Sequence, residues 1–233
     1  MIEAPPLVLL PGLNCSAALW SYLDVGPAVT PILTEPSLDG QVDRLLDELP
    51  AHFALAGLSL GGIVAMALVR RAPERVIRLC LMSTTSRPPT GAQYPMWARQ
   101  RTALAAGATA RDLQRELKAA LLSPHARTAR PELGEVALAM ADDVGTATLD
   151  AQLALQATRV DERPGLARVR CPTLIISGRD DALCRPERHV EMHALIAGSE
   201  LTELERCGHL SPLEQPAAVE SLLRRWQELA DVP

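Results

Sequence analysis

The sequence predicts an α/β protein with a mostly parallel sheet flanked by helices, and with an inserted helical cap. Short apolar runs alternate with helical patterns up to residue 86 and again from residue 164 onward. From residue 87 to residue 163 we recognise no strand, and Ala, Leu and Arg recur at helical spacing. We therefore expect one core domain made of residues 1–86 and 164–233, and a helical cap at residues 87–163.

The first part of the chain is expected to supply three strands of this sheet. Residues 6–12 form a short apolar run that is closed by Pro-Gly, which is typical of a buried strand entering a sharp turn. Residues 51–56 and 75–82 are two further apolar runs. Helical patterns lie at 41–49 and at 63–70, and the second of them is apolar on nearly every face. That second helix should therefore be packed inside the protein.

Two further groups of elements complete the prediction. The first group comprises the helices of the expected cap, near residues 97–106, 110–122, 132–141 and 146–158. The second group returns to the alternation of strand and helix: strands at 173–177 and 200–205, and helices at 185–196 and 216–229. The last helix has Pro216 in its first turn, where proline is favoured.

Composition excludes several classes of protein. Hydrophobic residues make up 48% of the 233 residues, so a packed core is expected and disorder is not. The net charge of −5 argues against nucleic acid or an anionic membrane as the main partner, because both repel an acidic protein. The five cysteines are scattered without a Cys-x-x-Cys pair, and no positively charged segment precedes an apolar stretch at the N-terminus. We therefore expect a cytoplasmic protein.

The segment Gly57-Leu58-Ser59-Leu60-Gly61 fits the pattern Gly-x-Ser-x-Gly. It lies between an expected buried strand and an expected buried helix, which is the context of a nucleophile elbow. The flanking glycines are needed because a side chain there would clash with neighbouring backbone, and the turn lifts the serine hydroxyl above the sheet edge. The backbone N–H of Leu60 would then point at the carbonyl oxygen under attack. Without that context, two glycines and a serine would simply fill a tight turn.

A nucleophilic serine needs a base, and the base needs a third group to orient it. In this class of fold the expected chain order is Ser, then acid, then His. Asp180 and Asp181 follow the strand expected at 173–177, and His209 follows the strand expected at 200–205. Both loops belong to the carboxyl edge of a parallel sheet, where ligand sites lie. His209 is the candidate base.

These segments resemble the α/β-hydrolase superfamily, and in particular its small, cap-bearing branch of serine esterases and enol-lactonases. The resemblance covers nearly the whole chain and rests on residues 9–13, 57–61, 173–181, 208–209 and 214–216. It implies that the acid is Asp181, the fourth residue of its Gly-x-x-Asp turn. It also implies an oxyanion hole made by the backbone N–H groups of Leu13 and Leu60. Pro11 departs from the pattern, because many relatives have His at this position.

The predicted function is hydrolysis of a carboxylic ester, lactone or thioester of a small, largely apolar substrate through an acyl-enzyme. Ser59 would attack, His209 would move the proton, and Asp181 would orient His209. This chemistry needs neither a metal nor an organic cofactor. The alternatives are hydrolysis of a carbon–carbon bond by the same triad, or a ligand receptor that turns over slowly. The fold alone does not choose among them.

Other residues that could carry chemistry are weaker candidates. His189 and His193 stand four residues apart on one expected helix, a spacing that can hold zinc, but no third ligand is suggested nearby. We expect both on a solvated helix face. Cys15 and Cys207 lie close to the candidate site in sequence but lack the elbow context, so we expect them to be small buried residues.

Overall fold

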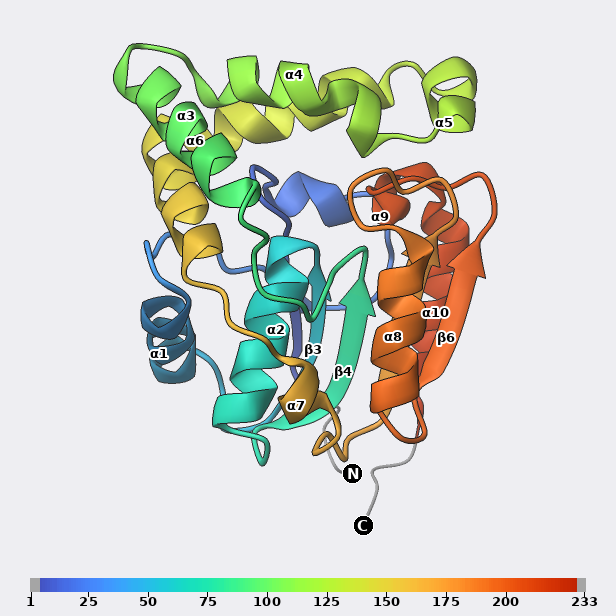
Figure 1. Ribbon diagram of the computed structural model, residues 1–233. Helices are drawn as coiled ribbons and strands as arrows, with labels where there is room; N and C mark the ends of the chain where they lie inside the picture. The colour runs from blue at the N-terminus through green and yellow to red at the C-terminus, as the bar shows by residue number, and fades with distance from the viewer. Residues whose placement is uncertain (1–4, 230–233) are drawn as a thin grey trace.

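The computed structural model describes residues 5–229, in which six parallel strands form one sheet in the order β2-β1-β3-β4-β5-β6 (Figure 1). All neighbouring strands pair in parallel. The strands are β1 (Leu7–Leu10), β2 (Ala28–Val29), β3 (Phe53–Leu58), β4 (Val76–Met82), β5 (Thr173–Gly178) and β6 (Glu200–Leu204). The predicted parallel sheet is confirmed.

Helices cover both faces of the sheet, because successive strand residues point to opposite faces and both sets are apolar. Val8 and Leu10 pack with α1, α2 and α8, whereas Leu7 and Leu9 pack with η1 and α10. The bounds of the helices outside the insertion are α1 (Leu38–Glu48), α2 (Leu60–Arg71), α7 (Arg163–Leu166), α8 (Pro186–Leu195), α9 (Ser211–Glu214), α10 (Pro216–Gln227) and the 3-10 helix η1 (Ala17–Trp20). Helix α2 is buried from Leu60 to Val69, as its apolar sequence predicts.

The helical insertion consists of α3 (Gln93–Ala105), α4 (Ala110–Leu121), α5 (Pro124–Ala129) and α6 (Leu133–Ala157). It forms a layer across the carboxyl ends of the strands (Figure 1). Gly145 kinks α6 with a φ of 75°, which explains why the sequence predicts two helices there. The insertion has a small core of its own around Trp97, Leu113 and Leu153.

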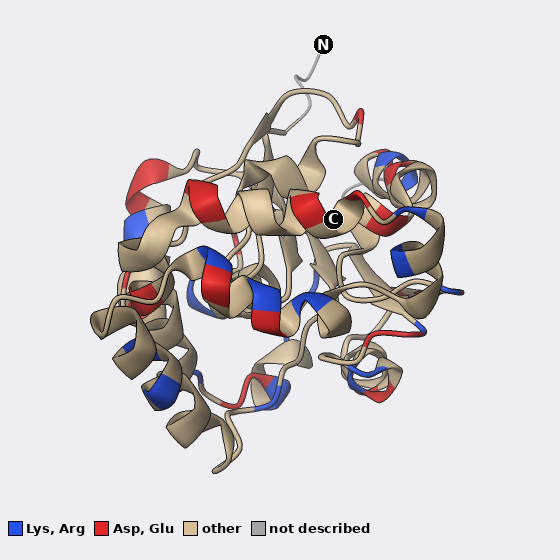
Figure 2. Ribbon diagram, turned by 90° about the horizontal axis from the view of Figure 1, so that it is seen from above, with Lys and Arg blue, Asp and Glu red and all other residues tan. Residues whose placement is uncertain are grey.

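Basic and acidic residues are interspersed on the outer surface of this layer (Figure 2). Arg111 pairs with Glu135 and Asp142, and Lys118 also pairs with Glu135. The exposed charges of the insertion therefore largely neutralise one another. None of the helices within residues 5–229 is both long and apolar enough to cross a membrane.

Elements that the sequence prediction missed are all short: β2, η1, α5, α7 and α9 have between two and six residues. Such lengths contain too few residues to display a period. The strand expected at 200–205 is present as β6, although only Leu204 in it is buried, because it lies at the edge of the sheet.

Candidate active site

Ser59 stands at a sharp turn between β3 and α2. Its φ of 54° and ψ of −113° lie in a region that L-residues rarely occupy, and its N–H donates to the carbonyl of Met82 at 2.9 Å. A Cβ on Gly57 would collide with the carbonyl of Gly61, and one on Gly61 would collide with the carbonyl of Leu10. The predicted steric need for both glycines is confirmed. Strain of this kind is concentrated at functional sites.

His209 and Asp181 form a buried pair between two loops at the carboxyl edge of the sheet. His209 Nδ1 lies 2.8 Å from Asp181 Oδ2, and the two side chains are 5% and 0% exposed. The other carboxylate oxygen, Oδ1, accepts the N–H groups of Leu183 and Cys184, both at 2.8 Å. With the Nδ1 proton directed at Asp181, the Nε2 atom of His209 is left free to accept a proton. Asp180, the neighbouring carboxylate, is exposed.

The pKa of Asp181 lies below its usual value. Burial acts to raise this pKa, but the nearby charge of His209, the hydrogen bond from His209, and the two backbone N–H groups together outweigh burial and lower it. Asp181 is therefore an anion at neutral pH, as a group that holds a histidine in one tautomer must be.

The loop that carries His209 is fixed from two sides. Its backbone N–H donates to the carbonyl of Leu121, at the end of α4, at 3.1 Å. Behind it, the buried carboxylate of Glu214 accepts the N–H groups of Gly208 and Ser123, both at 3.0 Å. Glu214 thus joins the His209 loop to the helical insertion. No sequence pattern predicts that this glutamate accepts hydrogen bonds from Gly208 and Ser123.

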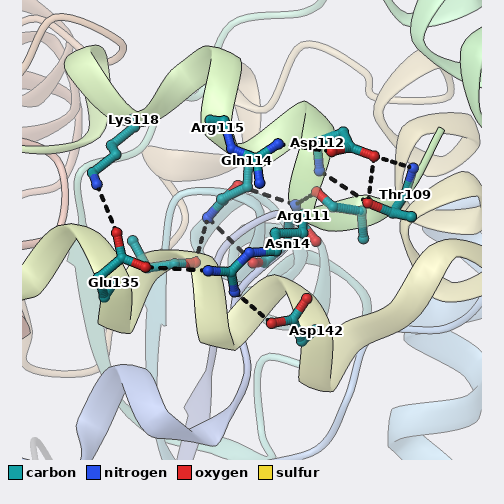
Figure 3. A network of polar contacts seen from close by, with 11 residues as sticks. Asn14, Thr109, Arg111, Asp112, Gln114, Arg115, Lys118, Glu135 and Asp142 are labelled. Atoms are coloured by element: carbon teal, nitrogen blue, oxygen red, sulfur yellow. Dashed lines mark hydrogen bonds and ion pairs between the residues drawn. The ribbon is translucent and has the colours of Figure 1, made fainter.

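The loop after β1 places the N–H of Leu13 beside the candidate site. Among residues 5–229, neither this N–H nor that of Leu60 donates to a protein acceptor. The next residue, Asn14, has a φ of 57° and reaches into the insertion. Its N–H donates to Gln152 Oε1 at 2.8 Å. Its side-chain amide donates to Gln114 Oε1 at 3.0 Å (Figure 3). Buried hydrogen bonds therefore hold this loop against α4 and α6.

Ser59 and His209 line one cavity of about 210 Å³ between the sheet edge and the insertion. Within the described residues, no hydrogen bond joins the side chains of Ser59 and His209. The core contributes Leu13, Cys15 and Ile63 to the wall. The insertion contributes Gln93, Met96, Trp97, Gln100, Gln114, Leu117, Leu121, Gln156 and Arg159.

The site thus combines a serine on a strained turn with a buried His–Asp pair on one cavity, and no protein acceptor among residues 5–229 binds the N–H groups of Leu13 and Leu60. A sequence model of the alpha/beta hydrolase family matches residues 7–222. The chain belongs to the alpha/beta hydrolase family.

One relative in this family is a pimeloyl-(acyl-carrier protein) methyl ester esterase of Aromatoleum aromaticum. It is 33% identical over 92% of this chain and 95% of its own length. Among solved structures, an esterase from Thermogutta terrifontis has a TM-score of 0.81 at 24% identity, covering 95% of this chain and 89% of that one. An enol-lactonase from Burkholderia xenovorans has a TM-score of 0.78 at 20% identity, covering 96% and 91%.

These likenesses confirm the predicted family and fold. The chain is a carboxylic ester hydrolase of the alpha/beta hydrolase family, and its substrate is an ester. The solved structures support the fold alone at these identities.

One sequence expectation about the hydrolase is wrong. His189 does not face solvent: its side chain is fully buried, and its Nε2 accepts the N–H of Thr84 at 3.1 Å. The hydroxyl of Thr84 in turn donates to the carbonyl of Ser59 at 2.8 Å. His189 therefore supports the turn at Ser59 through Thr84. His193 is exposed, as expected, and residues 5–229 contain no group of three side chains that could hold a metal ion.

We predict that His189 makes the hydrolase sensitive to mild acid. Burial lowers the pKa of His189 to about 4 from its usual 6.5. Between these pH values the unfolded chain binds a proton that the folded chain does not, so stability is complete above pH 6.5 and falls as the pH drops toward 4. We expect His189 to contribute a loss of about 2 kcal/mol between pH 7 and pH 5.

Urea unfolding of the wild type and His189→Gln at both pH values measures this contribution. The glutamine oxygen can still accept the Thr84 N–H, so the variant is expected to fold and to lose about 2 kcal/mol less than the wild type. His193→Gln, one turn along α8, is the matched control. Equal losses in the wild type and His189→Gln would show that His189 does not cause the acid sensitivity.

Cys15 and Cys207 are buried, as the sequence predicts. Cys15 lines the cavity, but burial raises the pKa of its thiol to about 12, although a backbone N–H lowers it slightly. Burial also raises the pKa of Cys207 well above its usual value. Both thiols are therefore protonated at neutral pH, and neither is an activated nucleophile.

Proposed function

We propose that Ser59, His209 and Asp181 are the catalytic triad of this esterase. The observation that carries the proposal is the combination of the strained Ser59 turn with the buried His209–Asp181 pair on one cavity. In the first step, His209 Nε2 takes the hydroxyl proton of Ser59 while the oxygen attacks the ester carbonyl. His209 then gives this proton to the leaving alcohol, and an acyl-enzyme remains.

Water completes the cycle by the same route. His209 removes a proton from water as the water oxygen attacks the acyl group, and returns the proton to Ser59 as the acid leaves. Asp181 keeps the proton on His209 Nδ1 and stabilises the imidazolium during both steps. The N–H groups of Leu13 and Leu60 are proposed to bind the oxyanion of each tetrahedral intermediate, and their lack of protein acceptors supports this role.

We also propose that residues 87–163 act as a cap that shapes the substrate site. Nine residues of this segment contribute to the cavity wall, most of them apolar or amide side chains. A lid of this kind excludes water from the ester, which strengthens the contacts to the oxyanion. Hydrogen bonds of Asn14 also join the cap to the loop after β1. Hydrogen bonds of Leu121 and Glu214 join the cap to the loop that carries His209.

The proposed substrate is the methyl ester of an acyl chain, in the first place the pimeloyl-(acyl-carrier protein) methyl ester. This proposal is supported by the relative from Aromatoleum aromaticum, which covers nearly the whole chain. The apolar part of the cavity wall fits a methylene chain, because Met96, Trp97, Leu117 and Leu121 all border it. A substrate carried on an acyl-carrier protein and the five free cysteines of this chain both fit an enzyme of the reducing cytoplasm.

Methanol release from this substrate by the purified protein tests the proposal. We expect the wild type to release methanol from the carrier-linked methyl ester and Ser59→Ala to release none. Methyl esters of free acyl chains and a p-nitrophenyl ester serve as comparison substrates. If only the comparison substrates are cleaved, the triad stands and the carrier-linked substrate is wrong.

A further inference from the structure

Arg159 is a buried cation in the wall of the proposed substrate cavity. It follows the last turn of α6, and only 8% of it is exposed. Its guanidinium carbon lies 5.3 Å from the centre of the Trp97 ring, and Nη2 donates to Gln93 Oε1 at 3.3 Å. The Nε–H group is buried and has no hydrogen-bond partner in the described chain.

The charge of Arg159 has no acidic partner among residues 5–229. Arg101 and Arg111 of the same insertion, by contrast, form ion pairs with carboxylates. Burial lowers the pKa of Arg159, which is the response of a cation that has lost its water without gaining an anion. The Trp97 face and one amide replace part of the hydration. An unpaired buried charge lowers the stability of the folded protein, which indicates that Arg159 serves a purpose other than stability.

The polar atoms around Arg159 indicate that this purpose is to bind a polar group of a ligand. Gln100 Oε1 and Gln156 Oε1 are buried on the same cavity and also lack partners within the described residues. Rotation of either amide would present N–H donors instead. Arg159 also borders a second, outer cavity of about 460 Å³ that shares Gln93 and Leu183 with the first. It therefore lies on the wall that the two cavities share.

We propose that the esterase also hydrolyses free monoesters of dicarboxylic acids, and that Arg159 binds the carboxylate which these monoesters, unlike the carrier-linked ester, carry at the end of the acyl chain opposite the ester. This inference rests on the proposed role of Ser59. The methylene chain would lie among the apolar side chains of the cavity, and the carboxylate would take the open Nε–H and an Nη–H of the guanidinium in a bidentate pair. Such a substrate supplies the anion that the protein itself does not.

Two esters of equal chain length isolate the carboxylate. Monomethyl pimelate and methyl heptanoate differ only in carrying a carboxylate or a methyl group at the far end. We expect kcat/KM of the wild type to be about 10- to 100-fold higher for monomethyl pimelate, which is the range of a charge-assisted hydrogen-bonded pair. Monomethyl esters of shorter dicarboxylic acids then give the chain length at which the preference is largest.

Arg159→Met tests whether this preference comes from Arg159. It should lose the preference through a higher KM for monomethyl pimelate, so that the ratio of kcat/KM for the two esters falls toward 1. Arg159→Lys should keep part of the preference, because the charge remains but the bidentate geometry does not. Arg101→Gln, which removes an exposed, ion-paired arginine of the same insertion, is the matched control.

A second readout does not depend on turnover. Pimelate should raise the Tm of Ser59→Ala but not that of Ser59→Ala/Arg159→Met. Without ligand, Arg159→Met should be at least as stable as the wild type, because it removes an unpaired buried charge.

A purely structural Arg159 would instead give a lower Tm and equal losses of kcat/KM on both esters, and this outcome would overturn the inference. An unchanged preference in Arg159→Met would do the same. Absence of hydrolysis of any ester by the wild type would contradict the proposed triad instead.

Discussion

Replacing Ser59 by alanine is expected to lower kcat for ester hydrolysis on the order of 10⁶-fold, while the protein remains folded. The size follows from the role of the nucleophile, whose removal in a comparable triad costs as much as removing the whole triad. The fold should survive because the hydroxyl of Ser59 makes no hydrogen bond to a protein group, and its backbone contacts to Met82 and Thr84 are independent of the side chain. Steady-state kinetics, with circular dichroism as the check on folding, measure both parts.

Cys15→Ala is the matched control for this experiment, because Cys15 lines the same cavity and carries a thiol that could be taken for a nucleophile. We expect it to retain activity within about tenfold of the wild type, since its thiol is protonated at neutral pH. Ser59→Ala with more than a hundredth of the wild-type kcat, or Cys15→Ala without activity, would contradict the assignment of Ser59.

The second large effect is expected from Asp181→Asn, which should lower kcat about 10⁴-fold. The asparagine side chain can still accept the backbone N–H groups of Leu183 and Cys184 with its oxygen. It then directs its NH₂ group at His209, which forces the His209 proton onto Nε2, where the base must be free. The variant should therefore fold and bind substrate with little change in KM.

Asp180→Asn provides the comparison, because Asp180 is adjacent in sequence but exposed. We expect its kcat to stay within about threefold of the wild-type value. If Asp180→Asn were the more damaging change, the acid would have been assigned one residue too late. Rescue of Asp181→Asn at high pH would fit the tautomer mechanism, because hydroxide can then replace part of the missing base function.

The parts of the site that follow from sequence are those with local causes. The Gly57–Gly61 turn is predictable because its two glycines are required by backbone approaches within one strand–turn–helix unit. His209 and an acid at Asp180 or Asp181 are predictable because each follows a parallel strand, and the carboxyl ends of such strands meet at one edge. The choice of Asp181 comes from the resemblance to the α/β-hydrolase superfamily. The two halves of the sheet could likewise be found on either side of the insertion.

The features of the site that could not be predicted from the sequence depend on contacts between residues that are distant in the chain. His189 looks like a surface residue of α8, but its partner Thr84 lies 105 residues earlier. Asn14 contacts Gln152 and Gln114, which lie 138 and 100 residues later. In the sequence Arg159 is one arginine among many, and only the folded chain places it on a cavity without an acidic partner among residues 5–229. Local patterns contain no information on such pairings.

The central claim, that Ser59 is the activated nucleophile of this esterase, is tested most directly by covalent labelling. The protein is treated with a fluorophosphonate at neutral pH, digested, and its peptides are mapped by mass spectrometry. We predict one label per chain, on Ser59, formed in step with the loss of ester hydrolysis and slowed on the order of 10³-fold or more in Asp181→Asn. A label on any other residue, or full activity in a protein whose Ser59 is fully labelled, would contradict the account.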